Sequence, residues 1–123
     1  MNFELTDDQK MIKNSVADFS QNNILPHRMI WDEAQTFPRE LFSEMGKIGL
    51  MGMLVPEKYG GAGLGYVEYK IAIEEVSRVC GSIGLSMAAH NSLCTGHILQ
   101  FGSEDQKKKY LPKLASAEWI GAW

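Results

Sequence analysis

Residues 82–101 read SIGLSMAAHNSLCTGHILQF, a run of 20 residues without Asp, Glu, Lys or Arg. A helix of this length is about 30 Å long, enough to cross a bilayer. Its Ser, His, Asn, Thr and Gln side chains carry too many hydrogen-bonding groups to be buried in lipid. The run therefore predicts a neutral helix that is enclosed by protein, with Gly81 before it and Gly102 as its C-terminal cap.

Amphipathic patterns predict further helices on both sides of this run. Thr6-Asp7-Asp8-Gln9 and Ser103-Glu104-Asp105-Gln106 are capping boxes, the signature of a helix start. Apolar spacing predicts helices over residues 6–22, 26–33, 38 to about 48, 66–80 and from 103 onward, with Pro112 opening a last short turn. The predicted fold is an all-α bundle of five to six helices around the uncharged helix. The tail 119–123, Trp-Ile-Gly-Ala-Trp, is predicted to be a short C-terminal strand.

Composition restricts the class of protein further. With 123 residues, 45% hydrophobic residues and 22% charged residues, the chain is long enough for one globular domain. A net charge of −3 argues against a partner nucleic acid held by phosphate contacts. Cys80 and Cys94, without a secretory leader or a transit peptide, favour a cytoplasmic protein with free thiols. The strand-like ending suggests that the polypeptide is a piece of a longer chain.

The residues alone do not form a catalytic constellation. His90 and His97 are potential metal ligands, but they lie about 10.5 Å apart along a helix axis, too far for one ion. The glycine-rich loop 60–65 lacks the Gly-Lys-Ser/Thr or strand–glycine–helix context of a phosphate site. What remains is the Ser86, Ala89, His90 and Leu93 side of the neutral helix, which is either a packing seam or the wall of an apolar cavity.

Several motifs occur in order along nearly the whole chain. They are Leu5-Thr6-Asp7-Asp8-Gln9, Phe37-Pro38, Gly49-Leu50-Met51-Gly52, Pro56-Glu57-Lys58-Tyr59-Gly60-Gly61-Ala62-Gly63, Glu74-Glu75, His90-Asn91-Ser92-Leu93, Phe101-Gly102-Ser103-Glu104-Asp105-Gln106-Lys107, Tyr110-Leu111-Pro112 and Gly121-Ala122-Trp123. Together they resemble the N-terminal helical domain of acyl-CoA dehydrogenases, most closely the short-chain (butyryl-type) and branched-chain members.

The resemblance implies a flavoprotein of fatty acid metabolism in three parts. Residues 1–118 correspond to the N-terminal helical domain, and residues 119–123 to the start of a truncated central β-domain. In this family a glutamate from the C-terminal part removes the α-proton of an acyl-CoA, and the β-hydrogen passes as hydride to FAD. An electron-transfer flavoprotein reoxidises the flavin, and the enzymes are commonly homo-oligomers. The base and the flavin signature lie beyond this chain, so the fragment alone is expected to be inactive.

The resemblance also implies substrate-binding residues. They are Leu85, Ser86, Ala89, His90 and Leu93, which line the acyl pocket and exclude water from the reacting carbons. Glutaryl-type relatives carry an arginine where Gly84 stands, and residues 82–101 carry no cation, so a monoacyl substrate is expected. Of the five residues, His90 departs from the pattern and is expected to shorten or polarise the pocket. No catalytic residue and no metal ligand is assigned.

Two other functions share these features. A freestanding helical binding or scaffold module keeps the fold without catalysis. A flavin oxidase or monooxygenase shares the helical domain but reacts with oxygen, and the residues that separate it from a dehydrogenase lie outside this sequence.

Overall fold

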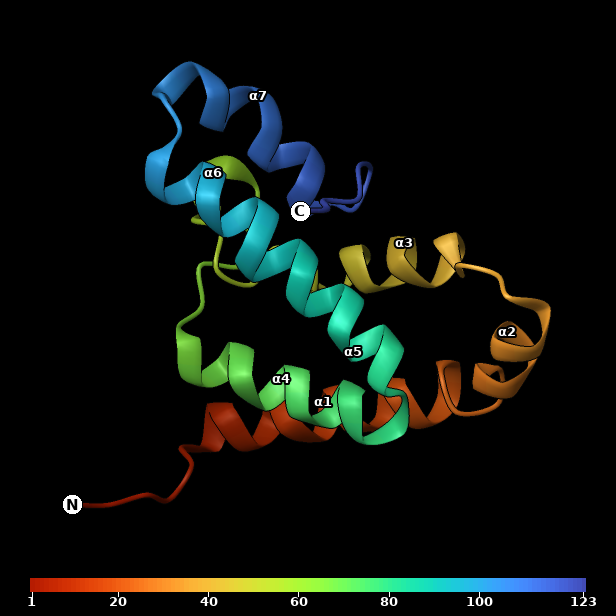
Figure 1. The fold of residues 1–123 in the computed structure, drawn as a ribbon. Coiled ribbons are helices and arrows are strands. Elements are labelled where there is room, and N and C mark those ends of the chain that lie inside the picture. Colours follow the sequence, from red (N-terminus) through yellow and green to blue (C-terminus); the bar gives the residue numbers. More distant parts are fainter.

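A computed structural model describes all 123 residues, and its regular secondary structure consists of helices alone. Apart from the short 3-10 helix η1, the helices form six packing units, because α5, η2 and α6 follow one another as a single long rod (Figure 1). The bounds are α1 Asp7–Asn23, α2 Arg28–Ala34, α3 Arg39–Lys47, η1 Glu57–Tyr59, α4 Tyr66–Val79, α5 Gly81–Ala88, η2 Ala89–Thr95, α6 Gly96–Phe101 and α7 Glu104–Ala115. The predicted all-α class is confirmed. None of these helices is both long and apolar enough to cross a bilayer.

The neutral run forms the rod that crosses the molecule. In Figure 1 it passes over α4 and α1, which pack against each other, and it ends beside α7. Its middle turn, η2, is a π-helix, in which each amide bonds a carbonyl five residues back instead of four. The rod thus lies between the helix pair on one side and α3 and α7 on the other.

The core fills the space beneath the rod. Its fully buried side chains include Phe42, Met45, Met51, Val76 and Met87 from α3, α4, α5 and the segment after α3. Burying an apolar side chain of this size contributes about 1.5–3 kcal/mol relative to its exposure to water. Met45, Met51 and Met87 are therefore core residues.

Both predicted capping boxes are formed. The Thr6 hydroxyl accepts from the Gln9 amide at 3.2 Å, and the Gln9 side chain accepts from the Thr6 amide at 3.0 Å. The Ser103 and Gln106 pair repeats this geometry at 3.2 and 2.8 Å. These reciprocal bonds fix the starts of α1 and α7 because they satisfy amides that a helix leaves free.

Replacing Ser103 with alanine should lower the free energy of unfolding by about 1 kcal/mol, the usual cost of a lost N-cap. Urea unfolding followed by circular dichroism measures this change. The matched control is Ser15→Ala, since Ser15 is an exposed residue inside α1 and alanine favours a helix interior. An equal loss in both variants would contradict the assignment of Ser103 as the cap.

Two elements near the C-terminus differ from the prediction. Residues 119–123 do not form a strand, because no other segment pairs with their backbone and a lone strand has no ladder. Pro112 does not open a separate turn but lies inside α7, which continues to Ala115. Leu111, Leu114 and Ala115 are buried on both sides of it, so tertiary packing extends the helix past the proline.

Candidate functional site: an uncharged face on the central rod

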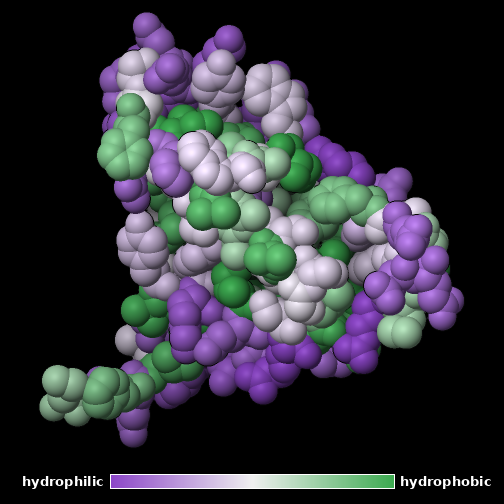
Figure 2. All heavy atoms as spheres, in the orientation of Figure 1, coloured by the Kyte–Doolittle hydropathy of each residue, from purple (hydrophilic) through white to green (hydrophobic).

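Four of the five predicted substrate-binding residues reach the surface of the rod. Leu85 is 71% exposed and Leu93 is 43% exposed, whereas Ser86 and Ala89 are half-buried. We call these four residues the stripe. In Figure 2 hydrophobic and near-neutral residues follow the course of the rod, and hydrophilic residues gather around the edges of this face. The stripe is an uncharged surface that is open to solvent in the isolated chain.

His90 lies on the other side, inside the protein. It is 0% exposed, and both ring nitrogens have partners. Nε2 lies 2.9 Å from the Met51 carbonyl oxygen and 3.0 Å from that of Leu114, and Nδ1 accepts the Gly121 amide at 2.9 Å. The expected direct effect of His90 on the pocket therefore has no geometric support, because its ring does not reach the stripe.

Ordinary helical spacing explains why His90 is buried. At about 100° per residue, His90 lies about 20° around the helix axis from the buried Ile83 and about 140° from the exposed Leu85, although the sequence analysis grouped it with the stripe. In η2 the buried residues are His90, Asn91 and Thr95. The five-residue separation of His90 and Thr95 is the repeat of a π turn, and both residues are buried.

Asn91 has a structural role that the sequence analysis missed. Its Nδ2 donates to the Leu50 carbonyl oxygen at 3.0 Å and to that of Met87 at 3.1 Å. Asn91 and His90 thus donate to the carbonyl oxygens of Leu50 and Met51, which lie in a buried segment without regular structure. Without these donors, each carbonyl group would be unpaired at a cost of about 1–3 kcal/mol. The signal was present: a neutral helix with adjacent polar residues beside a buried glycine-rich segment.

Gly84 does not lie on the stripe. It is buried, and a Cβ atom at this position would lie 2.0 Å from the Ser77 hydroxyl of α4. An arginine at this backbone position would have to displace α4 before it reached a ligand. The geometry therefore does not support the use of position 84 to distinguish this chain from glutaryl-type proteins. The rod still carries no Lys or Arg.

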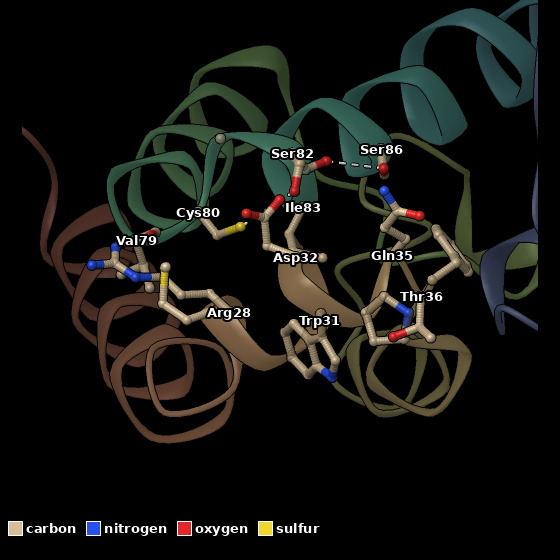
Figure 3. A pocket seen from close by; sticks show the side chains of 14 residues that line it. Arg28, Trp31, Asp32, Gln35, Thr36, Val79, Cys80, Ser82, Ile83 and Ser86 are labelled. Carbon is tan, nitrogen blue, oxygen red and sulfur yellow. Dashed lines mark hydrogen bonds between the residues drawn. The ribbon is translucent and has the colours of Figure 1, made fainter.

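A separate cleft opens between α2 and the start of α5 (Figure 3). Its volume is about 580 Å³, and Ser86 is the only stripe residue in its wall. The Arg28 guanidinium there donates to the Val79 carbonyl oxygen at 2.5 Å, and the Ser86 hydroxyl donates to the Ser82 carbonyl oxygen at 2.9 Å. These polar groups are engaged within the protein, and the cleft brings together no nucleophile, base and orienting group.

The glycine-rich loop does not form a phosphate cradle. Every backbone amide from residue 60 to 65 donates to an acceptor inside the protein. Gly60 and Gly63 have φ values of 86° and 62°, which glycine adopts without strain. A Cβ atom at Gly61 would lie 2.0 Å from the Val55 carbonyl oxygen. These glycines therefore serve a tight fold, and the loop offers no free amides to an anion.

The electrostatics of the loop are also structural. The Tyr59 hydroxyl donates to Glu104 Oε2 at 2.7 Å, which attaches the loop to the first turn of α7. This hydrogen bond lowers the pKa of Glu104 and raises that of Tyr59. The pair therefore stays a neutral phenol and a carboxylate at neutral pH, and it is a fixed link.

The fold and the stripe define a helical domain with an uncharged face suited to contact with another body. Residues 6–118 match the family described as "Acyl-CoA dehydrogenase, N-terminal domain". The chain belongs to this family and has its N-terminal domain.

Relatives of known sequence agree with this assignment. The mitochondrial isovaleryl-CoA dehydrogenase of Solanum tuberosum is 50% identical over 118 residues, which cover 94% of this chain and 29% of the relative. The short-chain specific acyl-CoA dehydrogenase of Clostridium acetobutylicum is 43% identical over 123 residues, covering 100% and 32%. The chain thus spans about a third of the length of these relatives.

Solved structures give the same result. Butyryl-CoA dehydrogenase from Megasphaera elsdenii superposes with a TM-score of 0.90 at 32% identity, over 98% of this chain and 32% of that one. A glutaryl-coenzyme A dehydrogenase in complex with glutaryl-CoA superposes with a TM-score of 0.94 at 36% identity, over 98% and 31%. The helical arrangement is therefore that of these dehydrogenases.

Proposed function

We propose that this chain is the N-terminal domain of an FAD-dependent acyl-CoA dehydrogenase that acts on a short-chain or branched acyl-CoA. The observation that carries the proposal is the stripe: an uncharged, solvent-open face on the central rod of a domain with this fold. An isolated soluble domain gains nothing from exposing Leu85 and Leu93 on the same rod. A hydrocarbon chain held between this face and a further domain gives these side chains an apolar partner.

In this role Leu85, Ser86, Ala89 and Leu93 bind the acyl tail. Each CH₂ group buried there contributes about 0.8 kcal/mol to binding. Excluding water also strengthens electrostatic interactions at the reacting carbons, because the local dielectric falls. His90 does not contact the tail: it lies on the buried side of the rod, where it forms hydrogen bonds with Met51, Leu114 and Gly121.

The charge pattern supports a monoacyl substrate. The rod carries no cation, and the Arg28 guanidinium in the neighbouring cleft is bonded to the Val79 carbonyl oxygen. A second carboxylate on the acyl chain would thus be desolvated on the stripe without a partner, which is costly. A butyryl or isovaleryl group fits this surface better than a dicarboxylic one.

The cofactor of the proposed enzyme, FAD, supplies hydride acceptance when it is bound. The glycine-rich loop does not fit its diphosphate, since the amides of residues 60–65 are all engaged. We assign FAD binding mainly to domains that follow this one, and residues 119–123 to the start of the next domain. A solved relative from Bacillus anthracis is described as complexed with FAD.

The remaining parts of the proposal concern partners and location. We propose an electron-transfer flavoprotein as the electron acceptor and a homo-oligomer as the assembled state. One structural relative comes from work on an electron-transferring flavoprotein of Acidaminococcus fermentans. The free thiols of Cys80 and Cys94 support a reducing compartment, and we propose the cytoplasm. The relatives named above are dehydrogenases, which favours this activity over an oxidase or a non-catalytic module.

The complete gene product that contains this sequence should purify yellow, and isovaleryl-CoA or butyryl-CoA should bleach its flavin spectrum without oxygen. In that protein, Ala89→Phe should lower kcat/KM about tenfold or more, because the added ring fills the space for the acyl tail, while the flavin content stays unchanged. The matched control is Asn14→Phe, on the exposed surface of α1. A colourless protein, or an equal effect of both variants, would overturn the proposal.

A further inference from the structure

Residues 117–123, here called the exit segment, have no regular secondary structure but are held at several points. The Arg39 guanidinium of α3 donates to the carbonyl oxygens of Ala117 at 2.5 Å and Glu118 at 2.9 Å. The Trp119 amide donates to the Lys113 carbonyl oxygen at 3.1 Å. The segment therefore has a defined path as it leaves α7.

The path then runs against the rod. A Cβ atom on Gly121 would lie 2.7 Å from Cys94 Cβ and 2.8 Å from Cys94 Sγ, so only glycine allows this approach. Two residues later the Trp123 ring stacks on His97, with ring centres 4.6 Å apart and planes within 6°. Gly121 thus lies against the half-buried Cys94, and Trp123 lies against the next turn of the rod at His97.

The bond that holds Gly121 in place comes from His90. Because Nδ1 accepts the Gly121 amide proton, Nδ1 carries no proton, and the neutral ring has its proton on Nε2. That proton is shared between the carbonyl oxygens of Met51 and Leu114. Only this tautomer satisfies all three contacts, so the neighbours of His90 select it.

We propose that His90 is a positioning residue that fastens the exit segment to the rod: its Nδ1 holds Gly121 over Cys94, and its Nε2 fixes the ring to the core. This contact fixes the position of the first residues after α7 relative to the stripe. The inference goes beyond the proposed function, since it requires neither substrate nor flavin and is tested on the 123-residue chain itself.

Protonation of His90 would open this contact. An imidazolium has no acceptor on Nδ1, and its N–H would face the Gly121 N–H. The titratable groups of the neighbouring elements do not stabilise a cation at His90. Arg39 of α3 is itself positive, the Glu118 carboxylate of the exit segment pairs with Lys113 of α7, and Cys94 of the rod is a free thiol. Burial, against the pull of the two carbonyls, lowers the pKa of His90 below its ordinary value of 6.5.

Substitution of His90 by either of two amide side chains tests the roles of Nδ1 and Nε2 separately. In His90→Asn the side-chain oxygen stands near the place of Nδ1 and accepts from Gly121, while in His90→Gln the amide nitrogen stands near the place of Nε2 and donates to Met51 and Leu114. We expect Cys94, in a Cys80→Ser background, to react with the thiol reagent DTNB at one fixed pH about as fast in His90→Asn as in the parent. In His90→Gln it should react about tenfold faster. Equal rates in both variants would show that His90 only supports the core and would overturn the proposal.

A second measurement uses the unsubstituted protein and so does not depend on the folding of a variant. In the labelled parent protein, the Gly121 amide resonance and the His90 ring nitrogens should titrate together, with a midpoint below 6.5. The free energy of unfolding should be constant above pH 6.5 and should fall as the pH drops from there through the lowered folded pKa, because the unfolded state takes up the proton first. A Gly121 resonance that ignores this titration, or a ring with its proton on Nδ1, would contradict the proposal.

Discussion

Replacing Phe42 with alanine should lower the free energy of unfolding by about 3–5 kcal/mol. Phe42 is 0% exposed, and its ring stacks on Phe37 with ring centres 4.6 Å apart. Its removal leaves a cavity between α3 and the helices beneath the rod, and close-packed neighbours refill such a cavity only in part. Since a domain is stable by only about 5–15 kcal/mol, this is the largest single loss that we expect. Urea unfolding followed by circular dichroism measures it.

The matched control is Phe101→Ala at the end of α6. Phe101 is 78% exposed, so its removal takes little apolar area out of contact with protein. We expect a change within about 0.5 kcal/mol, the range of ordinary surface substitutions. If both variants lost the same stability, the core would not lie where the structure places it.

Replacing Gly46 with alanine should destabilise the protein by about 1–3 kcal/mol, although alanine is the better helix former. Gly46 lies in α3, where a Cβ atom would be 2.3 Å from the Ser116 carbonyl oxygen and 2.8 Å from Ala117 Cβ. Neither neighbour is the end of a flexible side chain, so the backbone after α7 has to move. The gain in helix propensity is about 1 kcal/mol at most, and the clash exceeds it.

Gly81→Ala gives the comparison of opposite sign. Gly81 is the first residue of α5, and nothing lies within 4 Å of the position where a Cβ atom would stand. Here only the backbone preference acts, and we expect no loss or a gain of up to about 1 kcal/mol. Thermal unfolding of the two variants side by side tests the contrast. A stabilised Gly46→Ala protein would refute the close approach of α3 to the end of α7.

The sequence was sufficient for the helices because their signals are local. The boxes at Thr6 and Ser103 mark starts that depend on three or four neighbouring residues, and both are formed. Pro112 was misread because its effect is not local: burial of Leu111 and Leu114 keeps the chain helical past it. The 119–123 segment was misread because a strand requires a partner, and apolar residues alone do not supply one.

The site shows the same division. Leu85, Ser86, Ala89 and Leu93 were placed on one surface by helical spacing and by the resemblance, and the structure brings them to the surface of the rod. Their contact with an acyl chain stays a prediction. His90 was grouped with the stripe by the resemblance, although at about 100° per residue it shares the side of the buried Ile83 and Met87. Its partners Met51, Leu114 and Gly121 lie 24 to 39 positions away along the chain, and no local pattern links them.

The π turn also bears on how this chain tolerates changes in length. A π turn is equivalent to an α-helix that has taken in one surplus residue. Deleting one residue between 89 and 95 would let the rod close into a regular α-helix, with the residues of α5 and α6 still in phase. The penalty would fall on the register of His90 and Asn91 against their backbone partners. A one-residue deletion in this stretch is therefore expected to spare the helix and to disturb the hydrogen bonds that depend on the surplus residue.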